Sequence, residues 1–546
     1  MKTFVSVIAF IGIAHCGNLF AVSPAPDGGY AGNNTAEGTS ALFSLSSGVD
    51  NTATGFQALY YQTTGNYNTA TGFRALFRDT TGSQNTASGV NALSNNTMGN
   101  YNTATGVNSL YLNTTGGYNT ASGVQALFSN TTGYDNTATG FQALRSNTTG
   151  FYNMANGFQA LHSNTTGSLN TAIGVVALYS NTTASDNTAT GYQALYDNTT
   201  GAFNTAYGVN ALYSNTTGDG STAIGGNALT NNTTGVHNTA IGFLALGSNG
   251  TGNDDTANGY QALSSNTTGS TNTASGSGAL FTSTTGSQNT ATGYQALYSN
   301  TMGSQNTAVG EGALMNNTTG LSNTAVGIFS LFRNTSGTGN IGIDGGDRLT
   351  TGSFNIDIGN DGIEGEARTI RIGTPLFQTK TFITGIYNVN EGGTILPVYI
   401  NSDGQLGTMS SSRRFKNEIK PMDSVSEAVL ALKPVTFSYK PEIDPKGVRQ
   451  FGLVAEDVEK VNSDLVVRDA DGKPYTVRYD AVNAMLLNEF LKEHREVAEL
   501  KSIVALQKKT MQALAARLEK QETQIQKVSE QLEMHKPAQN LASNNR

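Results

Sequence analysis

Four carboxylates lie close together in the sequence, at Asp357, Asp361, Glu364 and Glu366. Two carboxyl groups at a suitable separation can hydrolyse a glycosidic bond, one as an acid and the other as a base or nucleophile. Here the four stand among Gly and Asn residues in a turn-like stretch, without a neighbouring histidine or aromatic cluster. The pattern therefore favours a solvated loop, or at most a cation site, over a catalytic pair.

A second polar stretch, residues 410–421, reads SSSRRFKNEIKP and divides the chain into two unlike halves. Of the 31 Lys and Arg residues, 22 fall at or after Arg413. Before this stretch, Gly, Thr, Asn and Ala dominate and charge is sparse. We interpret the stretch as a junction between a long repetitive region and a conventional, charged module.

Composition and charge bound the class of protein. Charged residues make up 13% of the chain, well under the roughly 25% of ordinary globular proteins. Simple disorder combines low hydrophobicity with high charge, which does not fit this chain. The net charge of -8 gives no reason to expect a nucleic-acid partner.

The N-terminus has the pattern of an export signal. Lys2 supplies a positive start, residues 4–14 form an apolar run, and Ala21 is a small residue suited to cleavage. The run is too short to span a bilayer. Cys16, the single cysteine, lies inside this segment, and His15 before it argues against a lipoprotein site. We expect a mature chain without disulfides and without a membrane span.

The body of the chain is an internal repeat. Residues 34–339 comprise eighteen copies of a 17-residue unit, approximately Asn-Thr-Ala-x-Gly-x-x-Ala-Leu-x-x-Asn-Thr-Thr-Gly-x-x. Positions 3, 5 and 9 are Ala, Gly and Leu in every copy. Each unit must therefore meet its neighbours in the same way, which is typical of a solenoid. The Gly residues and the Asn-Thr-Thr run exclude a helix of useful length.

Within the unit, alternation at positions 6, 8 and 10 predicts a short strand, with the Leu of position 9 on its opposite face. Apolar residues on both faces predict that one face fills the coil and the other meets neighbouring chains. The Asn-Thr-Thr-Gly segment predicts a turn whose stacked Asn and Thr side chains bond along the shaft. Regular Thr columns could alternatively present a flat face to ice or to a glycan.

The repeat resembles the heads of trimeric autotransporter adhesins, which are parallel β-rolls of short Ala/Gly units. The resemblance implies a homotrimeric rod, and eighteen coils at about 4.8 Å each would extend about 90 Å. We divide the chain by residue range as follows: signal peptide 1–21, linker 22–33, repeats 34–339, β-rich neck 340–409, chaperone domain 410–480, helical coiled coil 481–535 and disordered tail 536–546.

The C-terminal part contains mixed elements and then one long helix. Residues 428–432 look helical, 435–439 extended, and 451–461 pass from a strand to a helix; Asp403-Gly404 and Asp471-Gly472 mark hairpins. Beyond Tyr479 the pattern is helical with a seven-residue period. This seam comprises Phe490, Val497, Val504, Met511, Leu518, Ile525 and Leu532, with Leu500, Gln507, Leu514, Gln521 and Val528 at the alternate position. Seven successive heptads predict a coiled coil, whose polar Gln residues suit selection of register and oligomeric state.

Four segments in this half carry a more specific resemblance. They are SSRRFKNEI from Ser411, KPVTFSY from Lys433, FGLVAEDVE from Phe451, and the C-terminal coiled coil. In this order they resemble the endosialidase-type intramolecular chaperone domain that ends phage tail spikes and fibres. The resemblance implies a module that trimerises, templates folding of the fibre and, in many members, releases itself by autoproteolysis.

By this resemblance, Ser411 corresponds to the nucleophile of a Ser–Lys dyad and Lys416 to its base, with cleavage between Ser410 and Ser411. A serine hydroxyl is a poor nucleophile until a neighbour takes its proton. Arg413 and Arg414 could promote loss of the proton from the lysine. The family usually has an acidic residue after the serine, where this chain has Ser412.

The sequence thus predicts a mainly β protein, secreted or at the cell surface: an exported, adhesin-like homotrimeric fibre with its own assembly module. Its only enzymatic activity would be self-cleavage as a serine endopeptidase, without a cofactor, a metal or an external substrate. One alternative is a binding protein for ice or a glycan with the same assembly. Another is a fibre enzyme acting on polysaccharide, although only His162 and His237 interrupt the shaft.

Overall fold

The computed structural model describes residues 30–375, 377–378, 380–383, 396–401, 404–469 and 471–535. The chain divides into two units after residue 383, which are described separately. The predicted signal peptide, most of the N-terminal linker, Asp403 of the predicted 403–404 hairpin and the tail from residue 536 lie outside the described residues. No helix among the described residues is long and apolar enough to cross a membrane.

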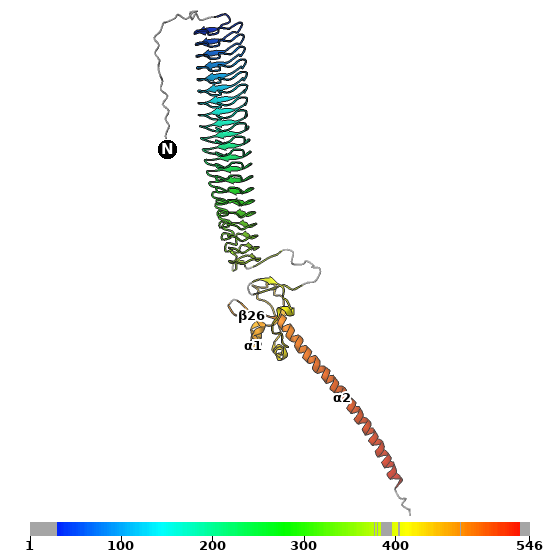
Figure 1. The fold of residues 1–546 in the computed structure, drawn as a ribbon. Helices are drawn as coiled ribbons and strands as arrows, with labels where there is room; N and C mark the ends of the chain where they lie inside the picture. The colour runs from blue at the N-terminus through cyan, green and yellow to red at the C-terminus, as the bar shows by residue number, and fades with distance from the viewer. Residues whose placement is uncertain are drawn as a thin grey trace, which may run out of the picture. The chain divides into compact units, whose positions relative to one another are not determined.

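The first unit is a solenoid with one short parallel strand in each coil (Figure 1). Its strands are β1 (Thr35–Glu37), β2 (Thr52–Thr54), β3 (Thr69–Thr71), β4 (Thr86–Ser88), β5 (Thr103–Thr105), β6 (Thr120–Ser122), β7 (Thr137–Thr139), β8 (Met154–Asn156), β9 (Thr171–Ile173), β10 (Thr188–Thr190), β11 (Thr205–Tyr207), β12 (Thr222–Ile224), β13 (Thr239–Ile241), β14 (Thr256–Asn258), β15 (Thr273–Ser275), β16 (Thr290–Thr292), β17 (Thr307–Val309), β18 (Thr324–Val326), β19 (Ile341–Ile343), β20 (Ile356–Ile358) and β21 (Ile370–Ile372).

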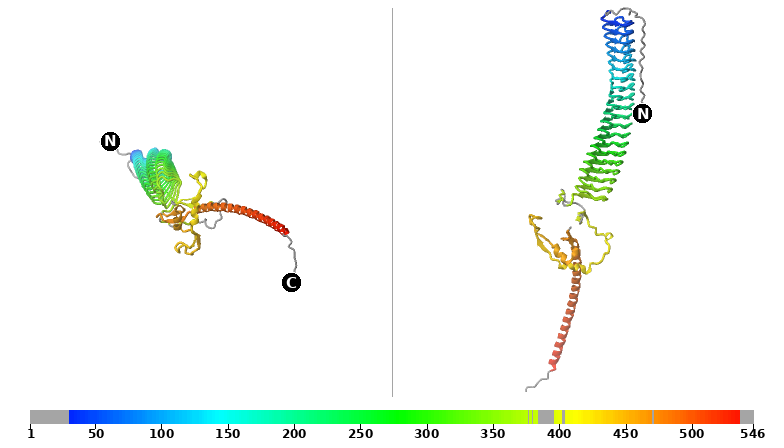
Figure 2. Two further views of the ribbon diagram at one scale, coloured as in Figure 1. Left: turned by 90° about the horizontal axis from the view of Figure 1, so that it is seen from below. Right: turned by 90° about the vertical axis from the view of Figure 1, so that its left-hand side faces the viewer.

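Successive strands pair in parallel with equivalent repeat positions side by side, so that Thr137 faces Met154 and Ala138 faces Ala155. The coils consequently stack one on the next along the shaft (Figure 2). The parallel sheet continues beyond residue 339, because β19, β20 and β21 pair in the same manner. The predicted fold class, a mainly β chain with a β-solenoid shaft followed by a small α+β region, is confirmed, and the shaft has about twenty turns where the repeat predicted eighteen.

The predicted position of the strand within the repeat was wrong. The strand occupies positions 2–4, Thr-Ala-x, and positions 6–11 form turns. Residues at positions 7 and 9 have left-handed backbone, with φ of 54° at Gln142 and 53° at Leu144. An extended strand cannot contain such residues. The alternation at positions 6, 8 and 10 therefore reflects a tight turn, whose bends are closed by bonds such as Ala143 N to Gly140 O.

The core of the shaft is filled within a single chain. The Ala of position 3 and the Ala and Leu of positions 8 and 9 are fully buried in nearly every coil, as at Ala138, Ala143 and Leu144. The left-handed turn directs both position 8 and position 9 inward, so Leu does not lie on an opposite face. The prediction that positions 8 and 9 lie on opposite faces was therefore wrong.

Two buried ladders of asparagine hold the coils in register. At position 1, Asn136 N donates to Asn119 Oδ1 and Asn136 Nδ2 to Gly150 O, at 3.1 and 2.8 Å. At position 12, Asn147 Nδ2 donates to Asn130 Oδ1 at 2.8 Å and to Gly150 O at 3.0 Å. Because both ladders satisfy buried backbone carbonyls, they stabilise the turns. The predicted stacking of Asn and Thr side chains along the shaft is confirmed.

The last coils of the shaft replace the alanine column with polar residues. The central residues of β19, β20 and β21 are Gly342, Asp357 and Arg371. Arg371 pairs with Glu366 at 2.8 Å, whereas Asp357 is fully buried and neither carboxyl oxygen has a hydrogen-bond partner. Burial raises the pKa of Asp357 to about 6, and repulsion from Glu366 adds to the shift. The prediction of a solvated loop was thus wrong for Asp357 and Glu366, which form a polar end to the core.

The second unit is a small α+β body from which a long helix extends. Its elements are β22 (Tyr399–Ile400), β23 (Leu406–Gly407), η1 (Arg413–Phe415), η2 (Asp423–Ala431), β24 (Val435–Phe437), β25 (Gln450–Gly452), α1 (Ala455–Val461), η3 (Ser463–Leu465), β26 (Val466–Arg468), β27 (Pro474–Val477) and α2 (Tyr479–Met534). The predicted strand, helix and hairpin positions in residues 428–479 are confirmed.

A modest core joins these elements. It consists of Val429, Val458, Leu465, Val477, Val482 and Met485, drawn from η2, α1, η3, β27 and the first turns of α2. Beyond Lys492, every described residue of α2 is exposed. The body therefore fixes only the beginning of α2.

Candidate functional site

A tight turn brings the two predicted dyad residues together. Ser412 is extended, η1 makes a single 3₁₀ turn, and Lys416 is extended again. The turn is closed by Phe415 N donating to Ser412 O and Lys416 N donating to Arg413 O, at 3.0 and 3.1 Å. The chain thus reverses between Ser411 and Lys416, although five residues separate them.

The two side chains are within hydrogen-bonding distance. Lys416 Nζ donates to Ser411 Oγ at 3.2 Å. Within the described ranges, no carboxylate forms an ion pair with Lys416; Glu418 lies 3.9 Å from Lys420 instead. Arg414 places its guanidinium over the Phe415 ring, 4.7 Å from the centroid. A hydroxyl group and an amine are therefore hydrogen-bonded here, and Arg413 and Arg414 are close to both in sequence.

This site is open to solvent in the single chain. Every residue from 410 to 421 is exposed, including Ser411 and Lys416. A catalytic lysine has to lose its proton, and burial is one means of achieving that. The structure of one copy therefore provides the pairing of the two groups but not their desolvation.

Sequence reasoning missed a polar cluster between η2 and α2. Ser426 is fully buried, donates to Glu489 Oε1 and accepts from Asn488 Nδ2 at 2.7 Å. Lys492 Nζ lies 2.7 Å from Glu489 and 3.4 Å from Ser426 Oγ. The only sequence signal was the i,i+3 pair Glu489–Lys492, because Ser426 is more than sixty residues away.

The charges of this second Ser–Lys contact do not favour catalysis. The hydrogen bond to Glu489 raises the pKa of Lys492, and the bond from Lys492 lowers the pKa of Glu489. A lysine held protonated in this way cannot accept the proton of Ser426. The cluster instead fixes η2 on the first turns of α2.

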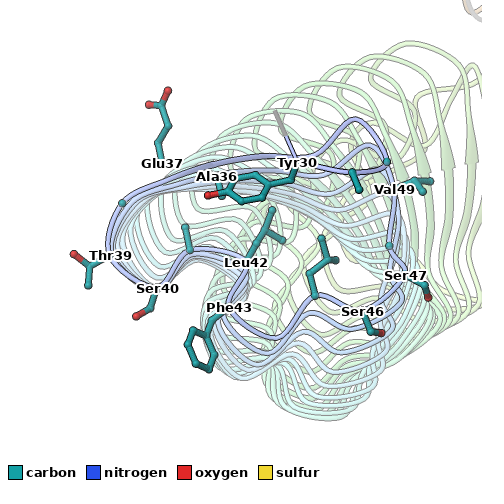
Figure 3. A pocket seen from close by; sticks show the side chains of 16 residues that line it. Tyr30, Ala36, Glu37, Thr39, Ser40, Leu42, Phe43, Ser46, Ser47 and Val49 are labelled. Carbon is teal, nitrogen blue, oxygen red and sulfur yellow. The ribbon is translucent and has the colours of Figure 1, made fainter. Parts of the chain in front are cut away.

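A hollow of about 840 Å³ lies at the first coil, between residues 30 and 49 (Figure 3). Leu42 points into it, whereas Glu37 and Thr39 point outward to solvent. Its lining is otherwise apolar, hydroxyl-bearing or backbone. Among the described residues, the hollow lies at the end of the solenoid core and does not bring catalytic groups together.

The outer face of the strands forms a regular array of hydroxyl groups. Position 2 is Thr in β1 to β18 except at Met154, and β2, β3, β5, β7, β10 and β16 read Thr-Ala-Thr. The Thr side chains point outward on both sides of a buried Ala, as Thr137 and Thr139 do around Ala138. From β17 onward, Val or Ile takes position 4. Glu37 is the only charged residue among the outward positions of β1 to β21.

The fold and the paired residues define a class of protein, a β-solenoid shaft that precedes a small α+β assembly module. Residues 411–467 match the family described as chaperone of endosialidase (peptidase S74). The match begins at Ser411, includes Lys416, and spans η1, η2, β24, β25, α1 and η3. No curated protein matches the chain. The chain thus carries an endosialidase-type chaperone domain behind a repeat shaft, as its sequence motifs indicated.

Proposed function

We propose that this protein is an exported homotrimeric fibre, adhesin-like and secreted or cell-surface, whose C-terminal domain is its intramolecular trimerisation chaperone. This proposal rests mainly on the exposed apolar seam of α2, the helix that follows the matched domain. All ten apolar seam residues are between 46% and 70% exposed. Over 56 residues the helix is about 84 Å long. The apolar seam from Phe490 to Leu532 covers about 63 Å of it. Such a stripe is stable in water when parallel copies bury it in a coiled coil.

The repeat makes such a chaperone useful. Neighbouring coils are nearly identical, so a displacement of 17 residues between chains or coils brings equivalent strands together again. Slow, register-dependent folding of this kind exposes unpaired strands. A C-terminal trimer that forms first raises the local concentration of the three shafts and fixes their alignment.

We further propose that Ser411 and Lys416 cleave the chain after assembly. Neutral Lys416 takes the hydroxyl proton while Ser411 Oγ attacks the carbonyl carbon of Ser410. The C–N bond between Ser410 and Ser411 breaks, and the proton passes to the departing nitrogen. This leaves an ester between the Ser410 carbonyl and Ser411 Oγ. Water hydrolyses the ester, which gives a carboxylate at Ser410 and restores the hydroxyl of Ser411.

Assembly of the trimer would supply the desolvation of Ser411 and Lys416 that the single copy lacks. Parallel α2 helices would bring three exposed junctions together, where mutual burial and the positive charge of Arg413 and Arg414 promote loss of the lysine proton. Cleavage would then follow trimerisation. Once the chaperone is removed, unfolding of the fibre could no longer be reversed through it, so the fibre would be kinetically stable.

The test compares the full chain with Ser411→Ala, Lys416→Ala and the control Lys420→Ala on a denaturing gel and by native mass spectrometry. We expect a fragment of 136 residues, 411–546, from the parent and the control. The two dyad variants should remain uncut, and all four proteins should be trimers. An uncut parent would refute the cleavage, and a monomeric parent would refute the assembly.

The Thr column on the outer face of the strands supports a second candidate function, binding of ice or of a glycan along the shaft. A Thr side chain, with its hydroxyl and methyl groups, stands at position 2 of β1 to β18 except at Met154, and the face is almost uncharged. Thermal hysteresis or glycan binding by the parent, lost in a Thr137→Lys/Thr139→Lys variant but retained in Thr149→Lys on the turn column, would support it. Absence of both activities in the parent would eliminate it.

A further inference from the structure

An apolar pocket of about 470 Å³ lies in the second unit, between the beginning of α2 and the β24–β25 hairpin. Its walls include Val429, Leu432, Val435, Phe451, Tyr479 and Val482, and none of its lining residues carries a charge. Phe451 is 80% exposed. Leu453 N donates to the Tyr479 hydroxyl at 3.0 Å, which ties the end of β25 to α2. The pocket is therefore an apolar depression that is open to solvent in the single chain.

The heptad seam of α2 extends into this pocket. Seven residues before Phe490 lies Asn483, and Leu486 and Tyr479 precede Leu500 by two and three heptads. Asn483, Leu486 and Tyr479 all line the pocket. Glu493, one heptad before Leu500, and Asn483 interrupt the apolar character of the seam in this part of the helix. The seam positions themselves continue to the pocket wall, so in a parallel assembly the pocket faces a second copy of α2.

The flanking heptad positions indicate which side chain would enter. With Phe490 at heptad position a and Leu500 at position d, Val482 occupies position g, beside the seam. Val482 also lines the pocket. In a parallel coiled coil, position g faces position e of the following heptad on the neighbouring helix. That position is Leu487, an apolar residue that is 59% exposed in its own chain.

We propose that in the assembled protein this pocket of each copy receives Leu487 from the α2 helix of a neighbouring copy. The inference rests on the proposed trimerisation. It assigns to the matched domain a role beyond carrying the helix, because Val435, Phe451 and Leu453 would clamp the first turns of the neighbouring helix. The clamp fixes the stagger of the three chains at the point where the helices begin, which the repetitive shaft cannot do for itself.

The test is disulfide trapping between different chains in a Cys16→Ser background. Thr436, a pocket residue on β24, is changed to Cys in one chain, and Leu487 is changed to Cys in a second chain with a tag of different size. The two are coexpressed and oxidised. We expect a covalent product that contains both tags. The control replaces Leu487→Cys with Leu491→Cys, an exposed residue of α2 on neither the seam nor its flanks, and should give no such product.

A second measurement covers the case in which a cysteine variant folds poorly. Leu487→Ser should lower the dissociation temperature of the oligomer, measured by circular dichroism and native mass, and Leu491→Ser should leave it near the parent value. Trimers without the Thr436–Leu487 product, or equal effects of the two serine variants, would overturn this inference and leave the proposed function standing. A monomeric parent would overturn the proposed function itself.

Discussion

Asp79 stands where nearly every other coil has an asparagine, in the buried ladder at position 12. Its Oδ1 accepts from Asn96 Nδ2 at 2.9 Å, whereas Oδ2 has no partner. Gln62, one coil earlier, has no partner for either atom of its side-chain amide. In Asp79→Asn, the new Nδ2 can donate to Gly82 O, as Asn113 Nδ2 does to Gly116 O. The substitution therefore restores the asparagine hydrogen bond that this coil lacks in the position-12 ladder.

The magnitude follows from the proton that Asp79 binds. Burial raises the pKa of Asp79 from 3.8 to about 8. Between about pH 4 and pH 8 the folded carboxyl therefore holds a proton that the unfolded chain has lost. The free energy of unfolding falls with rising pH in this window, by about 1.4 kcal/mol per unit, and is flat above it. At pH 7 the loss is about 4 kcal/mol, which Asp79→Asn removes.

Hydrogen exchange measured by mass spectrometry can detect this local change. Parent and variant are compared at equal pH, so that the intrinsic exchange rates cancel. We expect the added protection of coils 2 to 4 in Asp79→Asn to be small near pH 4 and to increase up to about pH 8. The control Asp254→Asn, an exposed carboxylate on the shaft surface, should change little. Equal protection of parent and Asp79→Asn across this range would refute the reasoning.

Two further predictions concern the shaft and the helix. A Cβ on Gly140, whose φ is 131°, would lie 2.4 Å from Gly157 O; Gly140→Ala should cost at least about 2 kcal/mol in local exchange protection. Gly250→Ala, where the nearest atom is 3.4 Å away, is its control, and equal effects would contradict the packing argument. The double variant Gln507→Leu/Gln521→Leu should raise the melting temperature of the helical circular-dichroism signal. It should also broaden the distribution of oligomers in native mass spectra. Both effects are expected because polar seam residues select one oligomeric state at a cost in stability. An unchanged melting temperature would contradict burial of the seam.

The strict repeat determined much of the fold in advance. Ala, Gly and Leu at fixed positions in every copy require equivalent contacts between coils, and Gly with Asn-Thr-Thr excludes helix. In the second unit, the order of turn residues and apolar runs located the hairpins, α1 and α2. These patterns each involve residues close together in the sequence, so turn preferences and apolar periodicity were sufficient to interpret them.

The position of the strand within the repeat could not be predicted in this way. The residue types at positions 6, 8 and 10 fit an extended strand, but in the observed turn Phe141 is exposed whereas Ala143 and Leu144 are both buried. The left-handed backbone of Gln142 and Leu144 distinguishes this turn from a strand. A non-glycine residue rarely adopts that conformation by its own preference. The stacking of neighbouring coils imposes it here, through bonds such as Leu144 N to Ala160 O.

The candidate site, too, was predictable from the sequence only in part. Sequence motifs singled out Ser411 and Lys416, and a resemblance gave them roles. Only the tertiary structure shows the η1 turn that brings their side chains to 3.2 Å, and the Ser426 cluster that fixes η2 on α2. The reason is distance along the chain: periodicity reports which residues share a face, whereas contacts such as Ser426–Asn488 exist only after the chain has folded back on itself.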